Sequence, residues 1–398
     1  MGAEMITLGC RLNFAESEAM RALAGDGTIV VNSCAVTNEA VRQTRQAIRR
    51  AHRSRPDARI VVTGCAAQLD PHSFAAMPEV AKVIGNADKY RAEAFSSENK
   101  VVTSDVMTAS VPPVAAGFLA RVRSFVAVQT GCDHRCTFCS IWQARGPSRS
   151  LPYEAVRDAV GRELDAGARE IVLTGVDITS YDTGLGLLCQ RLLADLLGLA
   201  RLRLSSLDSI EIDDALMELV AGEPRLLPHF HLSLQAGDDL ILKRMKRRHS
   251  RAEAVATVDR LKAVRADVTI GADLIAGFPT ESEEAALNTL ALLDDCDIVA
   301  AHIFPFSPRP DTPAARMPQV EREIVKARAA RLREAAAHRR GRWLDGLLGT
   351  RQRVLIENKE KGHSDGFAPV AIQGSSRGDL GTALVTARDG DALIGIFE

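Results

Sequence analysis

The sequence is poor in aromatic residues and contains no long apolar run. Phe, Trp and Tyr make up 4% of its 398 residues, which excludes stacking of bases on aromatic rings as the main way of binding a nucleic acid. No stretch approaches the roughly 18 to 20 consecutive apolar residues of a membrane helix. The N-terminal MGAEMITLGC also lacks the basic and apolar pattern of a secretion signal. We therefore expect a cytoplasmic protein that does not contact a membrane.

Lysine is also scarce, because it supplies only nine of the 50 basic residues and arginine supplies the others. Arginine suits bidentate contacts with phosphate groups. Residues 42–59 carry seven arginines against one aspartate, and residues 243–251 carry six cations and no acid. Each segment is interpreted either as a surface that faces phosphates or as an ordinary solvated helix face.

The organisation of the chain predicts an α/β fold of several domains, since 398 residues exceed what one hydrophobic core usually serves. Residues 1–110 alternate strands and helices, which indicates a small doubly wound α/β domain. Residues 111–121 are predicted to be a linker because they contain paired prolines and small residues. Residues 122–317 carry six strand signals separated by helical stretches, which indicates a partial TIM-type (β/α)6 barrel. Its predicted strands are residues 125–130, 170–174, 201–206, 229–234, 268–276 and 297–304.

The end of the chain changes character twice. Residues 318–345 are predicted to form a long charged helix whose basic excess faces either RNA or solvent. Residues 346–398 contain short apolar runs bounded by Gly and Asp, which predicts a small all-β module.

Three of the eight cysteines are closely spaced. Cys132, Cys136 and Cys139 form a C-x3-C-x2-C pattern directly after the predicted strand 125–130. Three thiolates on one loop can hold three corners of a cubane iron–sulfur cluster and leave the fourth iron free for a substrate. A zinc site is the alternative, but structural zinc needs four ligands and His134, inside the loop, is a poor substitute for a fourth cysteine.

Three further cysteines each follow an apolar strand and a small residue. Cys10, Cys34 and Cys65 have this context in common, and helical sequence follows each of them. In a parallel sheet the carboxyl ends of adjacent strands meet at one edge, so the pattern predicts a second three-thiolate cluster. The alternative is that they are ordinary buried cysteines. Cys189 and Cys296 have no partner motif and are predicted to be structural.

Both cysteine triplets and the β-rich tail resemble the methylthiotransferase family of radical S-adenosylmethionine (SAM) enzymes over essentially the whole chain. The segments TLGCRLNFAESEAM, VVNSCAVTNEAVRQTRQAIRRA and HIFPFSPRPDTPAARM are most similar to the branch that acts on tRNA bearing threonylcarbamoyladenosine. Two segments depart from the family pattern. Ile141-Trp142 stands where an Ile-Pro pair is usual, and the tail is short and poor in aromatic residues.

The resemblance implies two 4Fe–4S clusters and SAM as cofactors. The catalytic, SAM-cleaving cluster would be held by Cys132, Cys136 and Cys139, and an auxiliary cluster by Cys10, Cys34 and Cys65. The resemblance further implies SAM contacts in the strand-end loops. The candidates are Gly175, Asp177, Ser206, Gln235, Asp273 and Gly277, together with Arg145, which follows the cysteine loop and is expected to contact a carboxylate or phosphate. Asp177 and Asp273 have turn or cap chemistry as their alternative.

The implied reaction is methylthiolation of C2 of N6-threonylcarbamoyladenosine beside the anticodon, with SAM as the source of both radical and methyl group. The implied partners are the tRNA anticodon arm, held partly by a TRAM-type tail, and an electron donor such as a flavodoxin or ferredoxin, with no DNA. One alternative is the same chemistry on isopentenyl-adenosine or on an aspartate of a ribosomal protein. A remoter one is a non-catalytic iron–sulfur protein that binds RNA or carries electrons.

Overall fold

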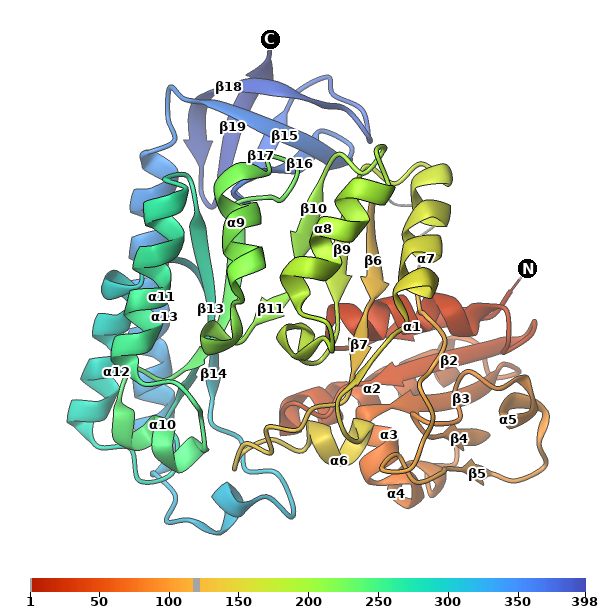
Figure 1. The fold of residues 1–398 in the computed structure, drawn as a ribbon. Coiled ribbons are helices and arrows are strands. Elements are labelled where there is room, and N and C mark those ends of the chain that lie inside the picture. The colour runs from red at the N-terminus through yellow and green to blue at the C-terminus, as the bar shows by residue number, and fades with distance from the viewer. Residues whose placement is uncertain (1, 117–121) are drawn as a thin grey trace.

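The structure is a computed structural model that describes residues 2–116 and 122–398. Residues 117–121, the second half of the predicted linker, lie outside the described residues. An N-terminal α/β part and a C-terminal β-barrel lie at opposite ends of a central, half-open barrel (Figure 1). Among the helices of the described ranges, none is both long and apolar enough to cross a membrane.

The N-terminal part is a five-stranded parallel sheet whose strands follow one another in chain order. Val30 and Val61 pack in one core with Met20, whereas Val31 and Val62 pack in another with helices on the opposite face, so helices cover both faces of the sheet. The strands are β1 (Glu4–Thr7), β2 (Thr28–Ser33), β3 (Arg59–Gly64), β4 (Lys82–Ile84) and β5 (Val101–Val102), and the helices are α1 (Arg11–Arg21), α2 (Asn38–Ser54), α3 (Cys65–Leu69), α4 (Pro71–Ala75) and α5 (Ala92–Ser96).

The central part is the predicted partial barrel, built from a three-stranded sheet and a four-stranded sheet of parallel strands. The predicted strand 201–206 is divided between the two sheets by Ser205. In order across the barrel the strands are β6 (Arg123–Ala127), β9 (Glu170–Thr174), β10 (Leu202–Leu204), β11 (Ser206–Leu207), β12 (His229–Gln235), β13 (Thr269–Ala276) and β14 (Ile298–Pro305).

Six helices lie outside these strands, and four of them begin at a residue whose side chain caps the helix. Ser250 and Glu253 form a capping box at the start of α11 (Arg251–Val264). Asp213, Asp238 and Ser282 accept backbone N–H bonds at the starts of α9 (Asp214–Gly222), α10 (Asp239–Met245) and α12 (Glu283–Asp295). The other two are α7 (Tyr153–Asp165) and α8 (Leu185–Asp195), and a short hairpin of β7 (Gln129–Thr130) with β8 (Arg149–Ser150) encloses the cysteine loop and α6 (Ile141–Arg145).

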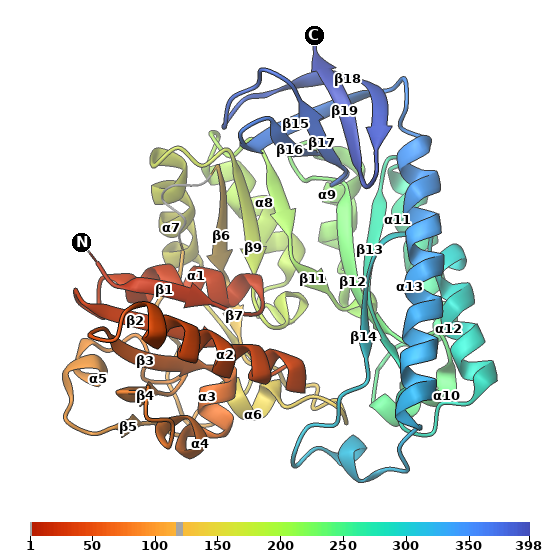
Figure 2. The ribbon, with the colours of Figure 1, turned by 180° about the vertical axis from the view of Figure 1, so that it is seen from behind.

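The predicted charged helix is α13 (Arg322–Asp345), and it runs along the barrel beside β14 and α12 (Figure 2). Val325, Ala329 and Leu332 are buried on its inner face, and Arg328 donates to the Glu281 carboxylate at 3.0 Å. The helix therefore packs against the barrel on one face, which neither interpretation of its charge anticipated.

The C-terminal part is a closed barrel of five strands around a core that contains Val354, Val370 and Leu393. Its strands are β15 (Arg351–Asn358), β16 (Lys361–Ser364), β17 (Pro369–Ile372), β18 (Leu380–Asp389) and β19 (Ala392–Phe397). It is docked on the amino ends of the central strands, where the Thr269 hydroxyl donates to the Gly366 carbonyl at 2.8 Å.

A buried charge cluster joins these two parts. Arg123, Arg201 and Arg203 lie 2.6 to 2.9 Å from the carboxylate of Glu170, which is fully buried. Burial raises the pKa of Glu170, but the three guanidinium groups outweigh it and hold that pKa well below its usual range. The ring of Phe367, from the C-terminal barrel, lies beside Arg203 at 4.7 Å.

Candidate active site

The three N-terminal cysteines follow neighbouring parallel strands at one edge of the sheet. In the sheet register, Ser33 at the end of β2 pairs with Gly64 at the end of β3. Cys34 and Cys65 are the next residues of their strands, and Cys10 follows β1 as the N-cap of α1. Because parallel strands end at a common edge, the fold brings the three thiols together.

Glycine precedes two of these cysteines at points where a side chain would collide. Gly9 has φ +99°, and a Cβ there would lie 2.9 Å from the Sγ of Cys34. Gly64 has φ +94°, and its Cβ would lie 2.4 Å from the carbonyl oxygen of Ser33. The close approach of the strand-end loops and the positive φ both require glycine.

The thiols of this group act on one another. The pKa of Cys34 is raised to about 12, first by burial and then by the neighbouring Cys65 and Cys10. Burial, with a smaller contribution from Cys65, raises the pKa of Cys10 as well. Neighbouring thiols thus oppose the ionisation of Cys10 and Cys34, and a bound metal cation would remove that opposition because metal ligands are thiolates.

Arg145 ties the helix after the cysteine loop to the N-terminal sheet. As the last residue of α6, it donates to both carboxylate oxygens of Glu16 at 2.7 and 2.9 Å and to the Sγ of Cys65 at 3.2 Å. Lys89 lies 2.6 Å from the same carboxylate, and all three charged side chains are at most 3% exposed. Burial raises the pKa of Glu16, but the two cations outweigh it and lower that pKa to about 2.

Cys132, Cys136 and Cys139 lie on the loop that β7 and α6 enclose. Burial is the first cause that raises the pKa of Cys132 and of Cys139 to about 12, and other cysteines of the loop add to it. Arg247, from the end of α10, places its Nη1 3.7 Å from the Sγ of Cys136 and donates to Asp208 at 2.9 Å. These contacts hold the cysteine loop against the carboxyl ends of the barrel strands.

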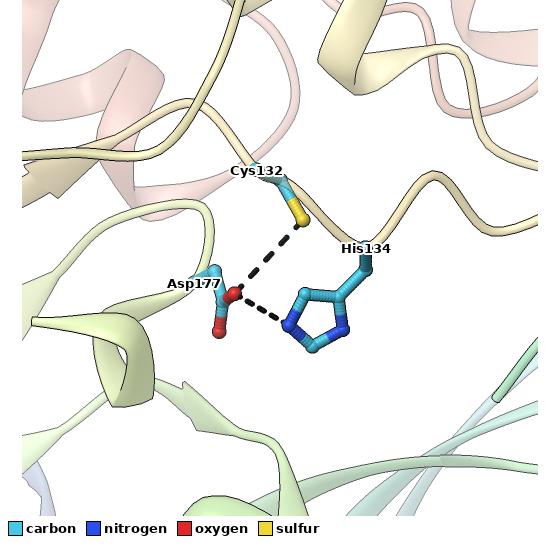
Figure 3. Close-up of side chains that lie close together, drawn as sticks. All are labelled: Cys132, His134 and Asp177. Atoms are coloured by element: carbon cyan, nitrogen blue, oxygen red, sulfur yellow. Dashed lines mark hydrogen bonds and ion pairs between the residues drawn. The ribbon is translucent and has the colours of Figure 1, made fainter. Parts of the chain in front are cut away.

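The loop is also anchored through Asp177, which follows β9 (Figure 3). The Oδ2 of Asp177 lies 3.9 Å from the Sγ of Cys132 and 2.9 Å from the Nε2 of His134. Hydrogen bonds to Asp177 and Glu211 raise the pKa of His134 to about 10. His134 is thus engaged by the carboxylates that follow the barrel strands.

The two cysteine groups face each other across the junction of α3 and α6. Cys65 begins α3, and it shares a hydrophobic core with Ala144 of α6. Asn86 donates to the Ala144 carbonyl at 2.8 Å and lies 3.8 Å from the Sγ of Cys65. Cys65 is also among the groups that raise the pKa of Cys139, after burial, so a thiol of each group lies within electrostatic range of the other group.

A cavity of about 770 Å³ lies between the N-terminal sheet and the inside of the barrel. We call it the chamber. The three N-terminal cysteines line it, and Phe138 and Ile141 bring the loop that carries the other three to its wall. Of the predicted SAM contacts, five line the chamber: Arg145, Gly175, Ser206, Gln235 and Asp273. The loop after β14 closes the wall, because the backbone N–H of Asn38 in α2 donates to the Ser307 hydroxyl at 3.1 Å.

Some predicted residues occupy other positions. Gly277 does not line the chamber, and a Cβ there would meet Val325 of α13 at 2.5 Å. Asp177 anchors the cysteine loop and accepts a hydrogen bond from Thr179 at 3.0 Å, which is the turn role considered as its alternative. Arg145 does contact a carboxylate, but that carboxylate belongs to Glu16 of the protein itself.

The two basic segments are largely occupied by internal contacts. Arg45 of α2 donates to the Ser73 hydroxyl at 2.8 Å and lies over the ring of Phe74. In residues 243–251, Arg247 binds the cysteine loop and Arg248 pairs with Glu211. The exposed arginines of α2, such as Arg50 and Arg53, keep the phosphate-facing and solvated interpretations open.

Sequence reasoning missed the residues that support the cysteines from a distance. Asn86, Lys89 and Glu16 carry no motif that marks them. One sequence feature did point to such a residue. Arg247, which lies 3.7 Å from the Sγ of Cys136, belongs to the cluster of cations in residues 243–251.

The donor chemistry fits iron–sulfur clusters. All eight cysteines are free thiols, and six of them form the two groups of three around the chamber. The remaining two, Cys189 and Cys296, are fully buried in the hydrophobic core of the barrel.

Comparison with known proteins assigns the family. A model described as the radical SAM superfamily matches residues 126–293, and one described as uncharacterized protein family UPF0004 matches residues 3–85. The threonylcarbamoyladenosine tRNA methylthiotransferase MtaB of Rickettsia prowazekii is 43% identical, over 93% of this chain and 91% of the relative. The MtaB of Thermotoga maritima is 34% identical, over 88% and 85%. A tRNA-2-methylthio-N(6)-dimethylallyladenosine synthase of Anaeromyxobacter sp. is 33% identical, over 91% and 85%.

The fold has counterparts among solved structures. The radical SAM methyltransferase TsrM of Kitasatospora setae, with cobalamin and a 4Fe–4S cluster bound, superposes with a TM-score of 0.56 at 15% identity, over 76% of this chain and 70% of that one. This likeness concerns the fold alone. The identity shared with the methylthiotransferases extends over nearly the whole chain, which therefore belongs to the radical SAM tRNA methylthiotransferase family.

Proposed function

We propose that this protein adds a methylthio group to C2 of N6-threonylcarbamoyladenosine beside the anticodon of tRNA. The observation that carries the proposal is that one three-cysteine group lines the chamber, while the loop that carries the other group reaches the chamber wall through Phe138 and Ile141. The names of the relatives from Rickettsia and Thermotoga supply the substrate. A sulfur transfer between a donor site and a radical-generating site needs both to reach the same base, and a shared chamber meets that requirement.

The radical SAM family uses a 4Fe–4S cluster and SAM, and we assign the cluster that cleaves SAM to Cys132, Cys136 and Cys139. We assign a second, auxiliary cluster to Cys10, Cys34 and Cys65. When bound, these groups supply the electron, the radical and the sulfur that an unactivated C–H bond of adenine requires, since no acid–base arrangement can break that bond.

The residues of this chain bind, orient and shield in this proposal. Gly175 after β9, Ser206 at the start of β11 and Gln235 at the end of β12 line the chamber, where they can hold SAM. Gln235 has φ +68° at the end of β12, a left-handed backbone that turns the chain sharply at the chamber wall. Phe14 and Phe125 add apolar surface that limits the access of water to the reacting atoms.

The proposed partners are the tRNA anticodon arm and an electron donor of the flavodoxin or ferredoxin class. The C-terminal barrel and the exposed arginines of α2 are the surfaces that we assign to RNA. Salt should weaken binding at these surfaces steeply, because arginine–phosphate contacts release counterions.

The substrate is tested by mass spectrometry of tRNA nucleosides from a strain that lacks the gene. The proposal expects loss of the methylthio form of threonylcarbamoyladenosine and an unchanged methylthio form of isopentenyl-adenosine. The reverse pattern would overturn the substrate assignment while leaving the chemistry in place.

The chemistry is tested separately with purified protein. After anaerobic reconstitution with iron and sulfide, reductant and SAM should yield 5′-deoxyadenosine. Folded, iron-loaded protein that forms none would exclude the radical mechanism and favour a non-catalytic iron–sulfur protein.

A further inference from the structure

Arg11 is the one guanidinium of the chamber wall that has no partner within the described residues. It begins α1, directly after Cys10, and its half-buried side chain lines the chamber. The other arginine of the wall, Arg145, is saturated by Glu16 and by its further hydrogen bonds. The guanidinium group of Arg11 makes no hydrogen bond or ion pair with any residue in the ranges 2–116 and 122–398.

The carboxylates nearest to Arg11 are already engaged. Glu170 and Asp273 act on Arg11 electrostatically. Glu170, however, is shared by three other guanidinium groups. Asp273 accepts from the imidazoles of His231 at 3.0 Å and His302 at 3.2 Å.

Nearby positive charges also act on Arg11. Arg123 and Arg203 lie close enough to repel Arg11. Arg123 and Arg203 have Glu170 as a partner, whereas the guanidinium of Arg11 at the chamber wall has no salt-bridge partner among the described residues. A half-buried cation without a partner lacks part of its hydration, so an anion that enters the chamber is favoured there.

The planar fork of a guanidinium group matches a carboxylate, which it binds through two parallel hydrogen bonds. N6-threonylcarbamoyladenosine carries a free carboxylate on its N6 substituent, whereas an isopentenyl group carries no polar atom. C2 and C6, which carries the N6 substituent, are atoms of the same six-membered ring, on either side of N1. A base whose C2 faces the cysteines next to Arg11 thus has its substituent in the same chamber.

We propose that Arg11 binds the threonyl carboxylate of the substrate and is the residue that selects threonylcarbamoyladenosine over apolar adenosine modifications. This inference rests on the proposed function. It assigns to Arg11 a role in substrate selection and none in SAM cleavage.

The test uses reconstituted holoenzyme and two anticodon stem-loop RNAs that differ in one group. One RNA carries threonylcarbamoyladenosine with its free carboxylate, and the other carries the methyl ester of that carboxylate. For the wild type we expect the free acid to bind about 10- to 100-fold more tightly, the range that hydrogen bonds to a charged group support. In Arg11→Gln the preference should shrink to within roughly threefold, and Arg11→Lys should recover part of it because the charge remains.

The matched control is Arg21→Gln, at the other end of α1, where Arg21 pairs with Glu18 on the surface. This variant should keep the wild-type preference for the acid. Because each protein is compared by its own acid-to-ester ratio, a general loss of affinity does not enter the comparison.

Two results would overturn the proposal. The first is an Arg11→Gln variant that still prefers the acid as strongly as the wild type, with Arg11→Lys unchanged too. The second is a variant in which SAM cleavage without RNA falls in step with methylthiolation, which would assign Arg11 to SAM. If the wild type binds the acid preferentially but methylthiolates neither RNA, the proposed function fails while the role of Arg11 in recognition stands.

Discussion

The two groups of three cysteines are built in opposite ways. Cys132, Cys136 and Cys139 share one loop, so their spacing is fixed within eight consecutive residues. Cys10, Cys34 and Cys65 come from three strand ends, and only the register of β1, β2 and β3 brings them together. The loop group is therefore a local feature of the sequence, whereas the strand-end group exists only when the N-terminal sheet is folded.

This difference predicts different sensitivities. A change in the N-terminal sheet should affect the strand-end group first, and the loop group should respond mainly to changes in its own residues. The buried network of Arg145, Glu16 and Lys89 is the element that couples the two groups.

The largest effects are expected from the cysteines themselves. Cys136→Ala should abolish formation of 5′-deoxyadenosine, whereas Cys34→Ala should retain some SAM cleavage and lose methylthiolation. Both losses should exceed the roughly 10- to 100-fold cost of altering a residue that only supports a metal ligand. Cys189→Ala, in the barrel core, is the control that should keep both activities. Full methylthiolation by Cys34→Ala would remove the strand-end group from the reaction.

Arg145→Met should lower the free energy of unfolding by about 3 to 5 kcal/mol, because it leaves the buried Glu16 with Lys89 as its remaining cation. It should also lower the iron content toward that of Cys34→Ala. Urea unfolding and iron analysis measure the two effects. Arg149→Met is the control. Arg149 donates only to backbone carbonyls, so its replacement leaves no buried carboxylate without a partner. Equal destabilisation by both variants would contradict the coupling role.

Low pH should weaken the network of Arg145, Glu16 and Lys89 and lower the free energy of unfolding. The pKa of Glu16 in the fold, about 2, lies below its unfolded value of about 4.3. Glu16 therefore stabilises the fold above the unfolded pKa, and this contribution, on the order of 3 kcal/mol, is lost as pH falls toward 2. In metal-free protein, Glu16→Gln should flatten this acid limb of the unfolding free energy, whereas Glu39→Gln on the exposed face of α2 should preserve it. An unchanged acid limb in Glu16→Gln would show that the network does not carry it.

The smallest effect on the free energy of unfolding is expected from replacing the glycine that precedes Cys65. Gly64→Ala should destabilise the protein by about 1 to 3 kcal/mol, because it places a side chain at φ +94° and against the Ser33 carbonyl. Gly25→Ala has a similar φ of +75° but meets no atom within 4 Å, so only the conformational part, about 1 kcal/mol, should appear. Thermal unfolding separates the two variants, and equal melting temperatures would exclude a steric contribution.

Sequence reasoning succeeded where structure depends on local pattern. The predicted strand 170–174, with three apolar residues at its centre, is β9 with the same bounds, and all five of its residues are buried. β4 and β5, of three and two residues, are too short to carry a periodic signal. β16, with the sequence KGHS, has no apolar residue and is a strand because β15 and β17 pair with it on either side.

In the candidate site too, features set by local sequence were predictable and features set by tertiary packing were not. The strand–cysteine repeat was sufficient to place Cys34 and Cys65 at one sheet edge. Nothing local connects Arg145 with Glu16, since 129 positions separate them and only the docking of α6 on the sheet joins them. Gly277 failed to reach the chamber for a similar reason, because the packing of α13 against the barrel places Val325 beside it.

The attachment of the C-terminal barrel to the amino ends of the central strands sets a length scale. β13 has eight residues, so its two ends are about 23 Å apart. The chamber is reached from one end of such strands and the C-terminal barrel covers the other. If the C-terminal barrel binds RNA, as proposed above, an RNA bound at both sites must span the height of the central barrel. The distance between the two sites would then select which nucleotide enters the chamber, because that nucleotide must lie at a fixed distance from the part of the RNA bound to the C-terminal barrel.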